Sequence, residues 1–333
     1  MSLRQHEFRI GVDLMGAESP PEMLLQAAES TLSFIPKNSK IIGIGSPYLA
    51  SMTKLPFVNA SETIEMEDNP LIAIRRKPDS SLCVGLRMLK EGEIDAFVSA
   101  GNTGALVFGS KKILSMQSGV LRPALCALMP TKKGPLAVLD VGANVQCRAI
   151  HLIQFAFIGA AYQQARGVKH PSVGLLNIGI EALKGTSELR LAYKKLMALS
   201  SQPKPLFRFV GNVEGKNVFE GEIDVLITDG FSGNVFLKTA EGIASLILDR
   251  VSEKFSSQIV EQVGTELSDL RRHLHYAEYP GALLCGVKGV VIKCHGYSSP
   301  QAFANGILAA VRLVEEGFLQ ILQNQMLSYS FSR

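Results

Sequence analysis

The chain of 333 residues is long enough to bury one large core or two closely joined ones. Its composition, 47% hydrophobic and 19% charged residues, excludes a disordered protein and favours a compact soluble one. The net charge of +4 is too small to indicate a nucleic-acid partner, and no basic stripe with interleaved aromatic residues supports one.

The five cysteines are widely separated and form no Cys-x-x-Cys pair, which is typical of reduced core thiols in the cytosol. No cysteines and histidines have the spacing of zinc ligands, so we expect no structural metal. The N-terminus lacks the apolar region of an export signal. The most apolar helical segment, about residues 150–162, is too short to span a bilayer. We therefore expect a cytoplasmic protein.

The first part of the chain predicts alternating strands and helices. Phe8 to Asp13 reads as a strand, and Asp13 lies at its carboxyl end, where ligands bind in open α/β sheets. Pro20 and Pro21 suit the first turn of a helix that runs to about Ser33. Further strands are expected at 40–45, 57–59 and 63–66, and helices at Pro70 and at 80–91. Gly43-Ile-Gly45 lacks the third glycine of the dinucleotide fingerprint, so no cofactor is expected.

The turn from Ser99 to Gly104 follows a short apolar strand at 96–98 and precedes a helical pattern of apolar residues. Gly101 and Gly104 permit a tight backbone, and Asn102 and Thr103 are good N-caps. The neighbouring N–H groups lie at the positive end of the helix dipole, so the turn suits a phosphate or a developing oxyanion. Helix capping alone also explains a single turn of this kind.

The second part repeats this plan. The runs 123–129 and 136–140 are joined by a loop at 130–135, and direct pairing would make them antiparallel in a mixed sheet. A buried helix is expected from about 148 to 166. Polar glycine turns follow four strands, at 140–144, 179–185, 229–234 and 294–299. We expect all the turns to leave one sheet edge and to form one shared anion or acyl site.

A long amphipathic helix is predicted from Val235 to about Ile259, because apolar residues recur every three or four positions. The segment 263–276 would fold back on it, which gives a helical hairpin inserted at about 235–280. Its apolar face would serve core packing, a homodimer contact or a membrane surface. A final helix, about 300–323, closes a single α/β domain over residues 1–333.

The chain contains no Gly-x-Ser-x-Gly elbow, Walker lysine or His-Glu-x-x-His helix. A site of N–H groups, amides and one lysine suits attack by phosphate on a thioester. Phosphate is already an anion at neutral pH, and a thiol with a pKa of about 8.5 leaves readily as thiolate. The protein then aims the phosphate and stabilises the oxyanion, and one donor lowers such a barrier by about 2.7 to 4 kcal/mol.

The motifs, taken together, closely resemble the phosphate acyltransferases of bacterial phospholipid synthesis, the PlsX family. They are Asp13-x-Met15-Gly16, Arg75-Arg76-Lys77, Ser99-Ala-Gly-Asn-Thr-Gly-Ala105, Asp140-Val-Gly-Ala-Asn144, Asn177-Ile-Gly179, Lys184-Gly185, Asp229-Gly-Phe-x-Gly-Asn234, Gly281-Ala282 and His295-Gly296. Some positions depart from the family pattern: Ala17, Glu18, Gln146, Pro280 and Tyr297. Gln146 stands where the family pattern has an aspartate, so a carboxylate at position 146 is not required for the chemistry of this chain.

The resemblance implies an enzyme that converts acyl-[acyl carrier protein] and inorganic phosphate into acyl phosphate and free carrier protein. It implies a homodimer that associates peripherally with the inner face of the membrane and supplies a membrane glycerol-3-phosphate acyltransferase. The implied fold is a three-layer α/β/α sandwich with a mostly parallel mixed sheet, similar to isocitrate and isopropylmalate dehydrogenases and phosphotransacetylase.

Site residues follow from the motifs as hypotheses. Lys184 and His295 would supply positive charge or a proton, Asp229 would orient one of them, and Asn234 would bind phosphate or the oxyanion. A solvated Lys184 is the plain alternative. Phosphate binding is assigned to Asp13, Gly101, Asn102, Thr103, Gly104, Asn144 and Gly233, and carrier-protein binding to Arg75, Arg76 and Lys77. The rival functions are an NAD-dependent dehydrogenase of the isopropylmalate dehydrogenase type and a non-catalytic carrier-binding scaffold.

Overall fold

The computed structural model describes residues 7–254 and 281–328. The predicted second helix of the hairpin, 263–276, lies outside the described residues. The described strands are β1 (Phe8–Asp13), β2 (Ser39–Gly45), β3 (Phe57–Asn59), β4 (Ala96–Ser99), β5 (Ala124–Thr131), β6 (Gly134–Leu139), β7 (Ser172–Leu176), β8 (Arg208–Val213), β9 (Val225–Ile227), β10 (Ala282–Cys285) and β11 (Val290–Lys293).

The described helices are α1 (Pro21–Ser30), α2 (Pro47–Ala50), α3 (Pro70–Arg76), α4 (Ser81–Glu91), α5 (Thr103–Ile113), α6 (Ala149–Ala165), α7 (Ser187–Ser200), α8 (Gly230–Lys254), α10 (Pro300–Glu315) and α11 (Phe318–Ser328). Short 3-10 helices lie at Thr31–Ser33 and Gly215–Glu220. None of the described helices is long and apolar enough to cross a membrane.

All these strands join one sheet in the order β3-β2-β1-β4-β11-β10-β5-β6-β9-β7-β8. Strand β10 is antiparallel to both of its neighbours, and β5 is antiparallel to β6, while the other pairs are parallel. The predicted mostly parallel mixed sheet and the β5–β6 hairpin are confirmed.

This topology overturns the prediction that all the polar turns leave the same edge. Because three antiparallel pairings separate the two halves of the sheet, β6, β9 and β7 run opposite to β1, β4 and β11. The turns at 140–144, 179–185 and 229–234 therefore start at the edge opposite to the turns at 99–104 and 294–299. Residues from both groups can meet only over a face of the sheet.

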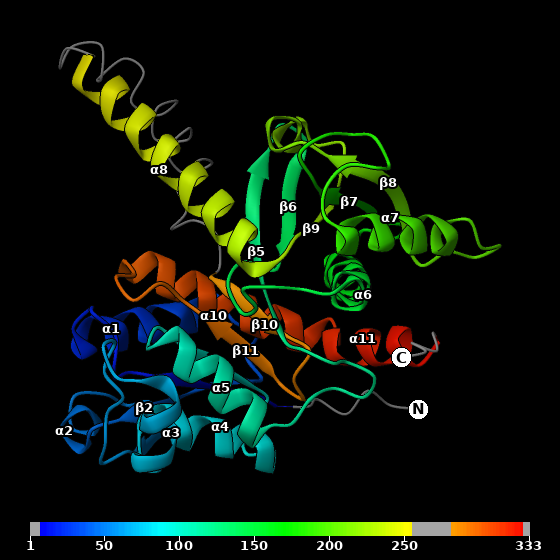
Figure 1. Ribbon diagram of the computed structural model, residues 1–333. Helices are drawn as coiled ribbons and strands as arrows, with labels where there is room; N and C mark the ends of the chain where they lie inside the picture. The colour runs from blue at the N-terminus through cyan, green and yellow to red at the C-terminus, as the bar shows by residue number, and fades with distance from the viewer. Residues whose placement is uncertain (1–6, 255–280, 329–333) are drawn as a thin grey trace.

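Helices cover both faces of the sheet (Figure 1). One face packs against α1, α6, α10 and α11, with Phe155 and Phe303 fully buried. The other face packs against α4, α5 and the first turns of α8. The α4 contact is close, because a Cβ at Gly85 would lie 2.0 Å from the ring of Phe97 on β4. Helix α8 then projects away from the sheet, as Figure 1 shows.

Several element predictions need correction. Residues 63–66 form no strand, and nearby pairing is limited to an isolated bridge from Glu62 to Ser80. The predicted final helix is two helices, because Gly317 adopts a positive φ of 65° between α10 and α11. Helix α8 begins at Gly230, five residues before the predicted start at Val235. The sequence reading omitted α7, β8 and β10.

Candidate functional site

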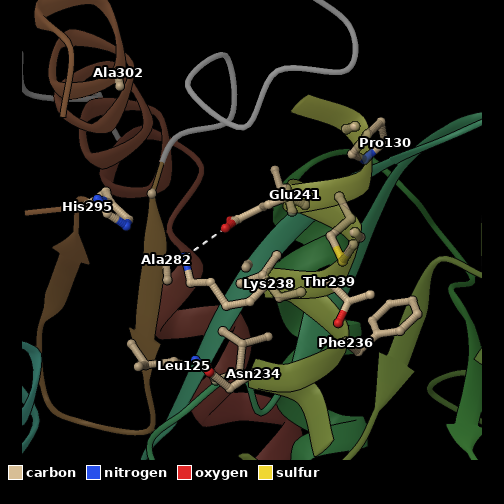
Figure 2. Close-up of a pocket in the computed structure, with 18 of the residues that line it drawn as sticks. Leu125, Pro130, Asn234, Phe236, Lys238, Thr239, Glu241, Ala282, His295 and Ala302 are labelled. Atoms are coloured by element: carbon tan, nitrogen blue, oxygen red, sulfur yellow. Dashed lines mark hydrogen bonds and ion pairs between the residues drawn. The ribbon is translucent and has the colours of Figure 1, made fainter. Parts of the chain in front are cut away.

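A cavity of about 1260 Å³ lies between α8 and the sheet, over strands β5, β10 and β11. Its polar lining comes from separate parts of the chain and includes Thr103 at the start of α5, Asn234 on α8, Lys293 at the end of β11 and His295 in the next loop. Figure 2 shows Asn234 on α8 on one side of the cavity and His295 on the other. Thr103, Asn234 and His295 were candidates from the sequence.

Lys293 lines the cavity but is not among the site residues that the sequence motifs indicate. Its side chain is buried, and its Nζ donates to the backbone oxygens of Ala100, at 3.3 Å, and of Cys294. Burial lowers the pKa of Lys293 to about 8, although the carboxylates of Asp13 and Glu18 act to raise it. An ammonium group with so little solvent interacts strongly with an anion that enters the cavity.

Asp13 holds the turn after β4 in place. Its buried carboxylate accepts hydrogen bonds from Ser99 Oγ, at 2.7 Å, and from the N–H of Met15, at 3.1 Å. Ser99 Oγ in turn accepts from the N–H of Gly101 at 3.1 Å. Burial raises the pKa of Asp13 despite these bonds. Asp13 does not line the cavity, so its place in the structure is that of a positioning residue for the turn at 99–104.

The side chain of Asn102 is fully engaged in the local structure. Its Oδ1 caps α5 by accepting from the N–H of Ala105 at 3.0 Å, and its Nδ2 donates to the backbone oxygens of Glu65, Met66 and Asp68. Only the backbone of this residue is left for an anion. Gly104 has a packing role, because a Cβ there would lie 2.6 Å from Pro70 of α3. Thr103, by contrast, lines the cavity.

His295 faces a basic environment. Burial lowers its pKa, and the nearby Lys238 and Lys293 lower it further. Its Nδ1 accepts from the N–H of Tyr297 at 3.2 Å. Lys238 forms an ion pair with Glu241 at 2.7 Å, and both residues line the cavity from α8 (Figure 2). The surroundings therefore favour a neutral imidazole at neutral pH.

The turn after β6 supports the start of α8. The buried carboxylate of Asp140 accepts from the N–H and Nδ2 of Asn144 at 2.7 and 2.8 Å. A Cβ at Gly233 would lie 1.9 Å from the backbone oxygen of Asp140, so only glycine fits this contact. Asn234 Nδ2 donates to the oxygen of Val141 at 3.1 Å. The contact places Asn234 at the cavity, although its strand β9 ends at the opposite edge from β11.

Asp229 and Asn144 have structural partners. Asp229 accepts from the N–H of Ser232 at 2.8 Å and from its hydroxyl at 3.1 Å, in the first turn of α8. Asn144 Nδ2 also donates to the oxygen of Pro123 at 2.7 Å. Neither residue lines the large cavity. Asp229 therefore caps the start of α8 in the protomer, and Asn144 holds the turn after β6 to Pro123.

Lys184 lies on the exposed loop between β7 and α7 and lines neither of the two cavities described here. The three basic residues Arg75, Arg76 and Lys77 have different surroundings. Arg75 and Arg76 are exposed, whereas Lys77 donates to Asp68 at 2.6 Å and to the oxygen of Thr63 at 2.8 Å. Lys77 thus stabilises the local fold.

A second cavity of about 590 Å³ is lined by residues 143–148 with Arg122 and His151. Burial lowers the pKa of His151 to about 4, and Arg122 and Arg148 lower it further. Burial also raises the pKa of Cys147 to about 12, so this thiol is not a nucleophile at neutral pH. Among residues 7–254 and 281–328, no group of three or more histidine, cysteine or carboxylate side chains could hold a metal ion.

Comparison with known sequences identifies the family. A family model described as a fatty acid synthesis protein matches residues 8–321. A phosphate acyltransferase of Pseudomonas fluorescens is 37% identical over 332 residues, which cover 95% of this chain and 97% of the relative. A phosphate acyltransferase of Staphylococcus epidermidis is 39% identical over 325 residues, which cover 95% and 98%.

Solved structures show the same fold at low sequence identity. The EutD phosphotransacetylase from Staphylococcus aureus aligns with a TM-score of 0.62 at 15% identity, over 93% of this chain and 95% of that one. A 4-hydroxythreonine-4-phosphate dehydrogenase from Klebsiella pneumoniae aligns with a TM-score of 0.53 at 11% identity, over 92% and 99%. The expected relation to the phosphotransacetylase fold is confirmed, and the sequence relatives do not favour the dehydrogenase alternative.

Proposed function

The chain belongs to the fatty acid synthesis protein family, together with curated phosphate acyltransferases, and we propose that it transfers an acyl group from acyl carrier protein to inorganic phosphate. The observation that carries this proposal is the cavity that brings a buried lysine, an amide and a helix N-terminus together. Lysine and the N-terminus of α5 attract phosphate, and an amide N–H suits the oxyanion of a thioester addition.

The proposed reaction follows from these positions. A hydrogen phosphate dianion lies between Lys293 and the start of α5, and one of its oxygens forms a bond to the thioester carbonyl carbon. Asn234 donates to the oxyanion that results. The carbon–sulfur bond then breaks, the phosphate proton moves to the leaving thiolate, and neutral His295 donates a hydrogen bond from Nε2–H to that sulfur. The products are acyl phosphate and the free thiol of the carrier.

We keep Lys184 in the proposed site as a residue contributed by a second copy of the chain. Its loop exposes three apolar side chains, Ile178, Ile180 and Leu183, at 80%, 63% and 84% of their surfaces. A cluster of this kind is typical of a protein contact surface. A homodimer in which this loop reaches the partner's cavity would give Lys184 the role inferred from the sequence motifs.

The carrier protein is proposed to bind at α3. Arg75 and Arg76 are exposed there beside Leu71 and Ile72, each about half exposed at 51%. Exposed arginines next to apolar side chains suit an acidic partner that also buries some apolar surface. Helix α3 packs on α5 near Gly104, so a carrier bound to it would stand close to Thr103 at the cavity.

We further propose that the protein works in the cytoplasm and contacts the inner face of the membrane. There it would pass acyl phosphate to a membrane glycerol-3-phosphate acyltransferase. Sedimentation with anionic lipid vesicles, compared with neutral vesicles, tests the membrane contact.

Trapping with hydroxylamine tests the reaction itself. Palmitoyl carrier protein, phosphate and the enzyme are mixed, and the hydroxamate formed from acyl phosphate is measured. We expect a product that depends on all three components. Replacing Asn234 or Lys184 with alanine should lower turnover by about a hundredfold or more, the effect of removing one oxyanion donor. Near-normal rates in a folded variant would remove that residue from the site, and no hydroxamate from the unmodified protein would refute the function.

A further inference from the structure

We propose that the apolar part of the large cavity binds the acyl chain of the substrate, in a groove between β5 and α8. This inference rests on the proposed acyl transfer and adds a location for the chain. Lys293 is level with Ala127 on β5, because both residues pair with Ala282 of β10, and Thr103, Lys293 and His295 contribute to the cavity wall on the β11 side. The methyl end of the chain would point toward the β5–β6 hairpin.

Strand β5 forms the floor of the groove. Leu125, Ala127 and Met129 alternate along it, so their side chains project from the same face of the sheet, and all three line the cavity. The lining continues through Pro130 to Thr131 at the end of the strand. Six residue steps from 125 to 131 span about 20 Å at about 3.4 Å per residue.

Helix α8 forms the opposite wall. Phe236, Ala240, Ile243 and Ile247 recur at helical spacing on the side of α8 that lines the cavity. Figure 2 shows Phe236 beside the strand pair that ends at Pro130. Ile243 and Ile247 are 52% and 51% exposed, so the described residues leave these two side chains about half uncovered. A ligand that covers them is apolar at this part of the wall.

The hairpin end of the groove suits a hydrocarbon. Lys238 and Glu241 stand on α8 between Phe236 and Ile243 and are paired with each other at 2.7 Å, while His295 lies across the cavity from Asn234. At the hairpin, Lys132 is already paired with Glu220 at 2.7 Å. The ring of Phe219 stacks on Phe236 with centroids 5.6 Å apart, and both rings line the cavity. The floor on β5 is apolar up to Pro130, and the α8 wall is apolar except for Thr239 and the Lys238–Glu241 ion pair.

The length of the groove matches a membrane acyl chain. The hydrocarbon core of a bilayer is about 30 Å thick, so a chain that spans one leaflet is about 15 Å long. From Ala127, level with Lys293, to Thr131 the groove extends about 14 Å at about 3.4 Å per residue, which is close to that length. A short acyl group would leave most of the apolar wall uncovered.

The test is the dependence of kcat/KM on chain length, measured with carrier thioesters from butyryl to palmitoyl. Burial of each added methylene should raise kcat/KM about two- to fourfold, since a fully buried methylene contributes about fourfold. Ala240 lies six residues after Asn234, about 9 Å along α8. We expect Ala240→Trp to block the groove there, so that palmitoyl transfer falls about tenfold or more while butyryl transfer changes less than about twofold.

Gly242→Trp is the matched control on the same helix. Residue 242 does not line the cavity, and a Cβ there meets no atom within 4 Å. It should leave the chain-length profile unchanged. An Ala240→Trp profile like that of the unmodified protein, or an equal palmitoyl loss in both variants, overturns the inference while acyl transfer still stands. Loss of a dimer in Ala240→Trp alone, seen by light scattering, also overturns it, because a second copy then fills the groove.

A binding measurement separates this inference from the reaction. If the unmodified protein makes no acyl phosphate from any thioester, the proposed function fails, and the groove is judged by cis-parinaric acid fluorescence. Binding to the unmodified protein and to Gly242→Trp, with loss in Ala240→Trp, supports an acyl groove. No binding to the unmodified protein overturns it.

Discussion

Replacement of Lys293 with methionine should have opposite effects on stability and on activity. The ammonium group is buried, and burial lowers its pKa from 10.5 to about 8. That gap corresponds to about 3 kcal/mol at 1.36 kcal/mol per pH unit, which opposes folding while the lysine is charged. Methionine has a similar length and no charge, so Lys293→Met should unfold at neutral pH with a free energy equal to or above that of the unmodified protein.

The pH dependence of the free energy of unfolding shows whether the buried ammonium group opposes folding. Below pH about 8 the lysine is protonated in both states, and the full penalty is present. Between pH about 8 and 10.5 the unfolded chain binds more protons than the folded one, so stability rises with pH. Between pH about 8 and 10.5, the free energy of unfolding of the unmodified protein should therefore rise by about 3 kcal/mol relative to that of Lys293→Met. The same variant should lose about a hundredfold or more in acyl phosphate formation, because a cation for phosphate is gone.

Urea unfolding at several pH values, together with hydroxamate trapping, measures both effects. Lys288→Met is the control, since Lys288 is exposed in the turn between β10 and β11 and does not line the cavity. A Lys293→Met variant that keeps near-normal turnover, or one whose unfolding free energy rises between pH 8 and 10.5 as much as that of the unmodified protein, would refute the role argued for this residue.

Three further predictions test other parts of the site. Changing Arg75 and Arg76 together to glutamate should raise KM for acyl carrier protein and weaken its salt dependence, while transfer from a small acyl thioester stays unchanged; equal losses with both substrates would exclude a docking role. Gly233→Ala should lower the free energy of unfolding by about 3 kcal/mol, because its Cβ would overlap a backbone oxygen of the turn after β6, and an unchanged urea midpoint would contradict that packing. The His295 imidazole should titrate by NMR below about pH 6.5, and Lys238→Met should raise the midpoint because one repelling charge is removed; a midpoint that falls would contradict this.

Strands with continuous apolar residues were predictable, because a strand whose two faces are both buried needs apolar side chains at successive positions. The short strand β10 was missed, since its four residues lie between β11, which follows closely, and β5, which is far earlier in the chain. The omission of α7 has no such reason. Thr186 caps it, and Leu189, Ala192 and Leu196 have helical spacing, so the signal was available in the sequence.

The residue types of the site were easier to predict than their surroundings. Thr103, Asn234 and His295, which were expected at the site because each follows a glycine turn or a buried strand, all line the cavity, and their roles stay predictions. The sequence could not show that the amide of Asn102 is used up by the loop at 65–68. It also could not distinguish Lys293, buried at the cavity, from Lys184, exposed on a loop, because burial depends on how distant strands meet.

The central position of β11 has a consequence for biosynthesis. Ala100, just after β4, bonds to Lys293, which is 193 positions later in the chain. A ribosome that has made only the first four strands leaves one side of β4 without its hydrogen-bonding neighbour, an edge open to aggregation. The sheet is complete only when its last strand has emerged from the ribosome. We therefore expect truncated chains not to fold properly and the full chain to fold slowly.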